Sequence, residues 1–141
     1  MLQRPKKTKF GKAQKGRISF LNKIDQKIVF GKYALVAKQP TILTAAQIAA
    51  ITLAIKRKLK KDPNSEFWLR VFPHIPVTKK PAEVRMGKGK GSVDHWVTRI
   101  RAGSVIVELK CSNIQLAKII FKIVNSKLPI KTTTVETRSS N

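Results

Sequence analysis

Positive charge is the feature that most limits how this chain can fold and act. Thirty Lys and Arg stand against seven Asp and Glu, which gives a net charge of +23 over 141 residues. So many like charges repel one another unless a polyanion neutralises them, and an ordinary globular enzyme is therefore excluded as the default interpretation. Hydrophobic residues still make up 42% of the chain, a normal share for a folded domain. We expect one small domain with a modest core and a strongly cationic surface.

Several other classes of function find little support in the residues. Cys111 is the single cysteine, so no intrachain disulfide is possible and a reducing compartment fits. His74 and His95 are too far apart in sequence for metal-ligand spacing. Residues 42–55 form the longest mainly apolar run, which is too short and too polar to span a bilayer, and the N-terminus lacks the apolar stretch of a secretory signal. We therefore expect no metal, no cofactor, no membrane and no small-molecule substrate.

The cations are concentrated in three runs rather than spread evenly. Residues 1–32 contain ten Lys and Arg and a single acid, Asp25, and the first twenty show no helical or strand periodicity. We interpret residues 1–23 as a basic extended arm. A second run surrounds Arg57, and a third extends over residues 79–90. Three such runs in one small chain argue against the plain alternative of a solvated face or a targeting signal.

The remaining pattern predicts alternating elements of an α+β domain over residues 24–137, followed by a tail over 138–141. Thr44 and Gln47 have the spacing of a capping box, and Asn113 can cap a second helix that Pro129 closes. We expect a mainly antiparallel sheet, two principal helices and one long loop. The expected strands are 27–38 with a possible bulge at Gly31, 66–72, a hairpin of 93–100 and 104–110, and 130–136; the helices are 44–61 and 113–128; the loop is 73–91.

The loop that ends at Gly91 is the most informative segment. Three glycines alternate with cations there, which gives a backbone that another backbone can approach closely, next to positive charge. A phosphate backbone needs this combination. Neither the phosphate-binding loop of nucleotide hydrolases nor the dinucleotide fingerprint matches, because the glycine spacing and the residues after each lysine are wrong. The loop residues in question are Arg85, Met86, Gly87, Lys88, Gly89, Lys90 and Gly91.

Isolated reactive and aromatic residues have simpler interpretations. Asp94 and His95 are neighbours on an expected strand, so their side chains should face opposite sides rather than form a catalytic pair. Cys111 is expected to be a small buried hydrophobe. Phe30 and Tyr33 are assigned to core packing. For Phe10 and Phe20 in the arm, packing and stacking on RNA bases stay equally open.

Several sequence segments closely resemble the L-sixteen family of large-subunit ribosomal proteins, in register over nearly the whole chain. The most specific are Phe67-Trp68-Leu69-Arg70-Val71-Phe72-Pro73, Pro76-Val77-Thr78, Lys80-Pro81 and Val84-Arg85-Met86-Gly87-Lys88-Gly89-Lys90-Gly91. Others are Met1-Leu2-Gln3, Thr8-Lys9-Phe10, Lys15-Gly16-Arg17, Leu43-Thr44-Ala45, Gln47-Ile48 and Lys127-Leu128-Pro129-Ile130-Lys131-Thr132-Thr133. After Arg17, the further arginines and glycines usual in the family are replaced by Ile18-Ser19-Phe20-Leu21, which puts rRNA contacts there in doubt.

The resemblance implies a structural ribonucleoprotein component that is not an enzyme. It implies one α+β domain that binds large-subunit rRNA beside the aminoacyl and peptidyl tRNA sites, contacts neighbouring ribosomal proteins and supports tRNA positioning and subunit assembly. The loop 85–91 would lie nearest tRNA, and Arg85 matches a position that bacterial members can hydroxylate. The expected rRNA-binding residues are Arg4, Lys6, Lys7, Lys9, Lys12, Lys15, Arg17, Lys56, Arg57 and Lys60.

Two further expectations concern an alternative function and the source. A free-standing basic RNA-binding or RNA-processing protein is the alternative, but catalysis would need a cluster of carboxylates or histidines that seven scattered acids do not supply.

Lys and Ile are abundant, as expected of an A+T-rich genome, so we expect a mitochondrial ribosome. The bacterial cytoplasm or a plastid is the alternative.

Overall fold

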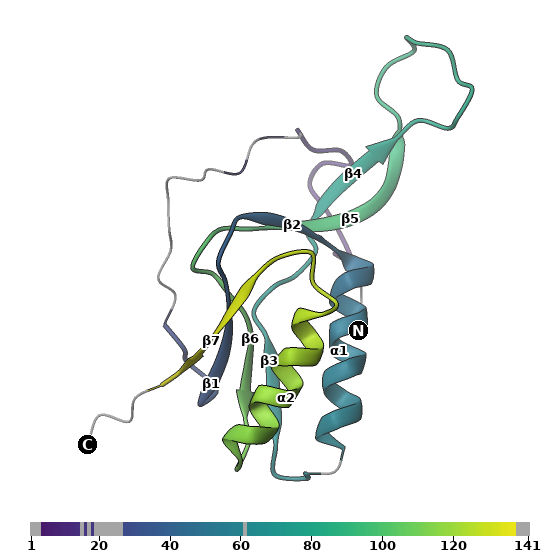
Figure 1. Ribbon diagram of the computed structural model, residues 1–141. Helices are drawn as coiled ribbons and strands as arrows, with labels where there is room; N and C mark the ends of the chain where they lie inside the picture. Colours follow the sequence, from purple (N-terminus) through teal and green to yellow (C-terminus); the bar gives the residue numbers. More distant parts are fainter. Residues whose placement is uncertain (1–3, 15, 17, 19–26, 61, 138–141) are drawn as a thin grey trace.

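Two antiparallel sheets and two helices form the part of the chain described by the computed structural model, residues 4–14, 16, 18, 27–60 and 62–137 (Figure 1). The larger sheet has the order β3 (Glu66–Leu69), β6 (Val105–Lys110), β1 (Tyr33–Ala37), β7 (Thr132–Glu136). The smaller sheet has the order β2 (Thr41–Thr44), β5 (Ser92–Ile100), β4 (Ile75–Lys79). The helices are α1 (Ala45–Leu59) and α2 (Ile114–Asn125). The predicted α+β class, with two helices and antiparallel sheets, is confirmed.

Both helices begin where local polar residues satisfy their first backbone donors. Thr44 Oγ1 accepts from the Gln47 N–H at 3.3 Å, and Gln47 Oε1 accepts from the Thr44 N–H at 3.0 Å. This is the predicted capping box of α1. Asn113 Oδ1 accepts from the Gln115 N–H at 2.8 Å and caps α2, again as predicted.

The core lies between the helices and one face of the larger sheet. Ile51 and Ile55 of α1 and Ile120 of α2 are almost fully buried, in one cluster with Leu35 and Leu109 of the sheet. The two helices lie side by side against this face (Figure 1). Neither helix is long and apolar enough to cross a bilayer, within the part of the chain described above. Neither helix covers the opposite face of the larger sheet.

The predicted hairpin of 93–100 and 104–110 is wrong. Strand β5 pairs with β2 and β4, whereas β6 pairs with β1 and β3, so the two strands belong to different sheets. Between them, Gly103 has φ +84° and its N–H donates to the Ala37 carbonyl at 2.8 Å. A turn sequence predicts a reversal or a bend equally well, and here the chain bends from one sheet into the other.

Several other boundaries differ from the prediction. The expected loop 73–91 contains strand β4. Pro76 does not prevent pairing there, because β4 is an edge strand of its sheet, where a missing N–H is tolerated. The loop is therefore limited to residues 80–91. Strand β2 was not predicted, and the expected strands 27–38, 66–72 and 130–136 shorten to β1, β3 and β7. The irregularity in β1 falls between Leu35 and Val36 rather than at Gly31.

Candidate nucleic-acid interface

The loop between β4 and β5 projects away from the rest of the molecule (Figure 1). Met86 at its tip is 99% exposed. Three consecutive residues have left-handed backbone: Gly87 at φ +99°, Lys88 at +56° and Gly89 at +78°. No atom lies within 4 Å of the position that a Cβ would take at Gly87 or Gly89. These two glycines therefore permit the left-handed backbone of the loop, and the space beside them is open, so that a ligand can approach the backbone closely.

Gly91 has a different role, at the base of the loop. A Cβ there would lie 2.6 Å from the Lys79 carbonyl oxygen, which is too close for any side chain. Gly91 thus permits β4 and β5 to approach each other where the loop begins. Lys80 also helps to shape the loop, since its ammonium donates to the Gly87 carbonyl at 2.5 Å.

The basic arm contacts the loop base and β5 directly. Lys12 Nζ donates to the Lys90 carbonyl at 2.9 Å, and Lys90 Nζ donates in return to the Ala13 carbonyl. Arg99 of β5 donates to the Gln14 carbonyl at 3.2 Å. The Arg99 guanidinium also lies against Gly16, which has φ +46°. We call this set the arm–loop contact; it joins the first and third basic runs of the sequence into one surface.

A groove of about 510 Å³ lies between the arm and the smaller sheet. Its floor is apolar, with Ile42, Pro76 and Val97, and its rim carries Lys90 and Arg99. Cations around an apolar floor suit a polyanion with flat bases better than a charged small molecule.

Arg4 lies in a neighbouring hollow with Asp94 and His95. Contrary to expectation, these last two side chains touch: His95 Nδ1 is 2.8 Å from Asp94 Oδ2. The strand register explains the difference, because Val77 pairs with His95 and Thr78 with Val93, which leaves Asp94 in a bulge where alternation fails.

The other predicted cations fall in two places. Lys6, Lys7 and Lys9 of the arm are exposed, and Lys9 Nζ lies 5.5 Å from the centre of the Phe10 ring. Lys56, Arg57 and Lys60 are exposed at the C-terminal end of α1. They lie twelve to sixteen positions after Thr44, roughly 18–24 Å along the helix axis, so they form a second surface. Lys15, Arg17 and Phe20 lie outside the described residues.

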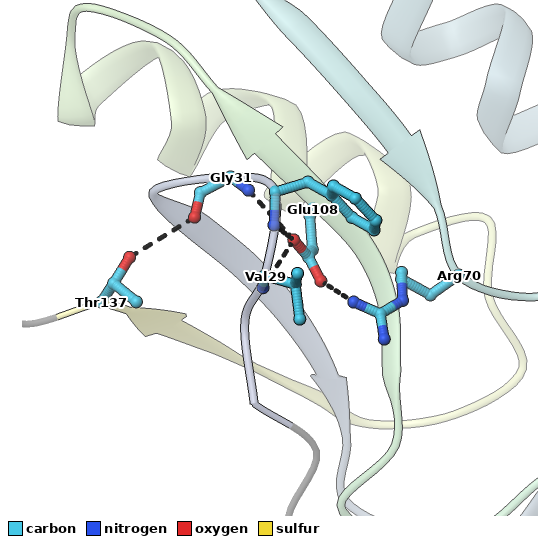
Figure 2. A network of polar contacts seen from close by, with 6 residues as sticks. Val29, Gly31, Arg70, Glu108 and Thr137 are labelled. Carbon is cyan, nitrogen blue, oxygen red and sulfur yellow. Dashed lines mark hydrogen bonds and ion pairs between the residues drawn. The ribbon is translucent and has the colours of Figure 1, made fainter.

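A buried carboxylate, which the sequence reasoning missed, organises the face of the larger sheet away from the helices (Figure 2). Glu108 is fully buried and accepts hydrogen bonds from the N–H groups of Val29 at 3.1 Å, Phe30 at 2.6 Å and Gly31 at 3.0 Å. It also forms an ion pair with Arg70. Burial by itself raises the pKa of Glu108, but the three backbone donors and Arg70 together outweigh it and hold that pKa below its ordinary value.

This arrangement also corrects the assignment of Phe30. The core position predicted for Tyr33 is confirmed, but Phe30 is 55% exposed and its ring stacks on Trp68 with centres 5.8 Å apart. Nothing in the local sequence signals the Glu108 contacts, because the bonded residues are 77 to 79 positions away.

No catalytic arrangement emerges from the geometry of the described residues. Among them, no group of three His, Cys, Asp or Glu side chains could hold a metal ion. Cys111 is buried as predicted, and burial raises the pKa of its thiol, which disfavours the reactive thiolate.

Comparison with known proteins identifies the family of the chain. Residues 5–135 match the family model described as Ribosomal protein L16p/L10e. The chain belongs to this family. Among similar members, the large ribosomal subunit protein uL16 of Borreliella burgdorferi (strain ZS7) is 46% identical over 128 residues, 91% of each chain. The proteins of the same name from Borrelia duttonii (strain Ly) and Rhodopseudomonas palustris (strain BisA53) are 45% and 46% identical. The alignments cover 95% of this chain and 96% of the Borrelia protein, and 93% of this chain and 94% of the Rhodopseudomonas protein.

These L16-family relatives are bacterial, so they lend no support to the expected mitochondrial source. They are consistent with the bacterial alternative.

Proposed function

We propose that this chain is a structural constituent of the large ribosomal subunit that binds large-subunit rRNA and neighbouring ribosomal proteins. The observation that carries the proposal is the match to one ribosomal family over residues 5–135, together with relatives named for the large subunit. The net charge of +23 supports an RNA partner, because each phosphate contact releases condensed counterions. A bacterial ribosome is favoured by the relatives; a mitochondrial one is supported by composition alone.

The arm–loop contact and the end of α1 provide two separate cationic surfaces for rRNA. Lys12 and Lys90 hold the arm against the loop base through backbone carbonyls. Their ammonium groups fix the shape of this surface, and Arg4, Lys6, Lys7 and Lys9 of the arm are exposed to contact phosphates. Lys56, Arg57 and Lys60 would then bind a different stretch of rRNA.

The tip of the loop is the part we assign to tRNA. Arg85 and Lys88 are exposed, and no described residue accepts a hydrogen bond from either of them. Because the loop carries no core residue, a ligand has to order its tip. Arg85 is the stronger candidate, since a planar guanidinium can hold a phosphate through two parallel hydrogen bonds and an ammonium cannot.

A strain in which Arg85→Ala replaces the wild-type protein tests this assignment. We expect large subunits to accumulate normally and the elongation rate to fall, because the core is untouched and a tRNA contact is lost. Arg101→Ala, at the exposed turn between β5 and β6, is the matched control and should change neither. Polysome profiles and elongation rates are the measurements. Scarce large subunits that elongate normally would instead make the loop an assembly element.

Sedimentation separates this function from the alternative of a free-standing RNA-binding protein. The wild-type protein should cosediment with large subunits through a high-salt sucrose cushion. Recovery in the soluble fraction only would refute the ribosomal role.

A further inference from the structure

An exposed aromatic patch lies on the face of the larger sheet away from the helices, and the proposed RNA contacts do not use it. Strand register places Trp68 and Glu108 on this face, since their neighbours Phe67 and Leu109 belong to the core side. Phe30 rests on Trp68 with an angle of 26° between the rings, and the Arg70 guanidinium carbon is 5.5 Å from the centre of the Phe30 ring. Val29 beside it is 65% exposed. We call Phe30, Trp68 and Arg70 the Phe30 platform.

The backbone beneath this ring is fixed far more firmly than an exposed loop requires. Three successive N–H groups, from Val29 to Gly31, donate to the buried Glu108 carboxylate. From the other side, Thr137 Oγ1 donates to the Lys32 carbonyl at 2.8 Å, and the Thr137 N–H donates to the same oxygen at 2.9 Å. Figure 2 shows the longer contact of Thr137 Oγ1 with the Gly31 carbonyl, at 3.4 Å. A Cβ on Gly31 would lie 2.6 Å from the Leu109 carbonyl oxygen, so this segment is pressed against β6. The backbone that carries Phe30 is thereby held in place, while Phe30 itself stays 55% exposed.

We propose that the Phe30 platform stacks an unpaired base of the large-subunit rRNA. This inference rests on the function proposed above. Each base has a π-face, and aromatic side chains with adjacent arginine are the usual surface on which single-stranded bases stack. Charge favours RNA over a protein partner, because Arg70 lies over the ring, Lys27 and Lys32 lie on either side of Phe30 in the sequence, and Glu108, the acid beneath the ring, is buried and paired. The platform differs from the cationic surfaces in that it would hold a base rather than phosphates.

Binding of the full-length protein to a large-subunit rRNA fragment gives a first test. Phe30→Leu keeps an apolar side chain and the backbone bonds to Glu108 but removes the π-face. We expect it to weaken binding roughly five- to 150-fold, the range for loss of one base–aromatic stack. Phe30→Tyr should bind like wild type. The slope of log K against log salt should be the same for all three proteins, because stacking releases no counterions.

A matched change in charge distinguishes this effect from ordinary electrostatics. Lys60→Ala, at the end of α1, should weaken binding and also reduce the salt slope by about one. Phe30→Leu binding as tightly as Phe30→Tyr would overturn the proposal, as would a salt slope that changes with Phe30→Leu as it does with Lys60→Ala.

Zero-length crosslinking locates the contact in assembled particles. Large subunits are irradiated with ultraviolet light and digested with trypsin, which cuts after Lys27 and Lys32 and releases a five-residue peptide whose single aromatic residue is Phe30. We expect a nucleotide adduct on Phe30 in this peptide. If the subunits contain the protein and carry adducts on arm peptides but none on the Phe30 peptide, the platform is refuted and the proposed function is left intact. Absence of the protein from the subunits would instead refute the proposed function.

Discussion

The buried carboxylate of Glu108 gives the sharpest test of what holds the chain together. We consider Glu108→Gln, which keeps the shape of the side chain and removes its charge. The wild-type carboxylate accepts three backbone N–H bonds and the Arg70 ion pair. In the variant, the amide NH₂ has to face one of these donors, so at least one buried donor loses its acceptor.

The expected loss of stability follows from the burial of Glu108 and Arg70, the two members of the ion pair. Breaking a buried ion pair typically costs about 3–5 kcal/mol, because the remaining charge is left without a partner. The Arg70 side chain is 25% exposed and water can partly solvate it, so we expect the lower end, about 3 kcal/mol. At about 3 °C per kcal/mol for a domain of this size, the melting temperature should fall by roughly 10 °C.

Glu66→Gln is the matched control, since Glu66 also pairs across β3 and β6 but in the open. Its carboxylate lies 3.5 Å from Lys110 Nζ and its side chain is 58% exposed. The loss of such a surface pair should cost well under about 1 kcal/mol. Urea and thermal unfolding, followed by circular dichroism, measure both variants. Equal stability of the two variants would refute our account of the carboxylate.

The pH dependence supplies an independent check with a defined sign. The pKa of Glu108 is lower in the folded protein than in the unfolded chain, so folding favours the charged form. Its contribution to stability is complete above the ordinary glutamate pKa and is lost as the pH falls through the lowered folded value. The stability gap between wild type and Glu108→Gln should therefore be largest at neutral pH and shrink in acid. A gap that stays constant into strong acid would show that the charge is not its source.

Two smaller changes test backbone features by urea denaturation. Gly31→Ala should destabilise by about 1–3 kcal/mol, because its Cβ would meet the Leu109 carbonyl at 2.6 Å, whereas Gly11→Ala, with open space around it, should be nearly neutral. Equal effects at both positions would mean that the segment is not pressed against β6. Thr44→Ala removes the hydroxyl of the capping box and should cost about 1 kcal/mol; an unchanged unfolding midpoint would mean that the cap contributes nothing.

Features set by nearby residues could be predicted from the sequence, and features set by distant partners could not. The Thr44–Gln47 capping box spans three residues and was predicted correctly. The turn at Gly103 was also local, but which sheet each flanking strand joins depends on β1, β2, β3 and β4, so the predicted hairpin failed.

The same division applies to the candidate site. The Gly and Lys pattern of the loop marked an exposed cationic segment, and the structure gives Gly87 and Gly89 left-handed φ. The reciprocal bonds of Lys12 and Lys90 join residues 77 and 78 positions apart. No local rule anticipates that a lysine in such a loop binds the arm.

The length of β5 gives the fold a mechanical property. Its nine residues extend for roughly 30 Å, with the C-terminal half paired to β2 beside the core and the N-terminal half at the base of the loop. If a strand of this length tilts as a rigid unit, a rotation of about five degrees at the core end displaces the loop end by about 3 Å for this rise per residue. Lys90 and Arg99 attach the arm near the two ends of β5. Substitutions at the junction of β2 and β5 therefore act on the position of a loop tip that they do not touch.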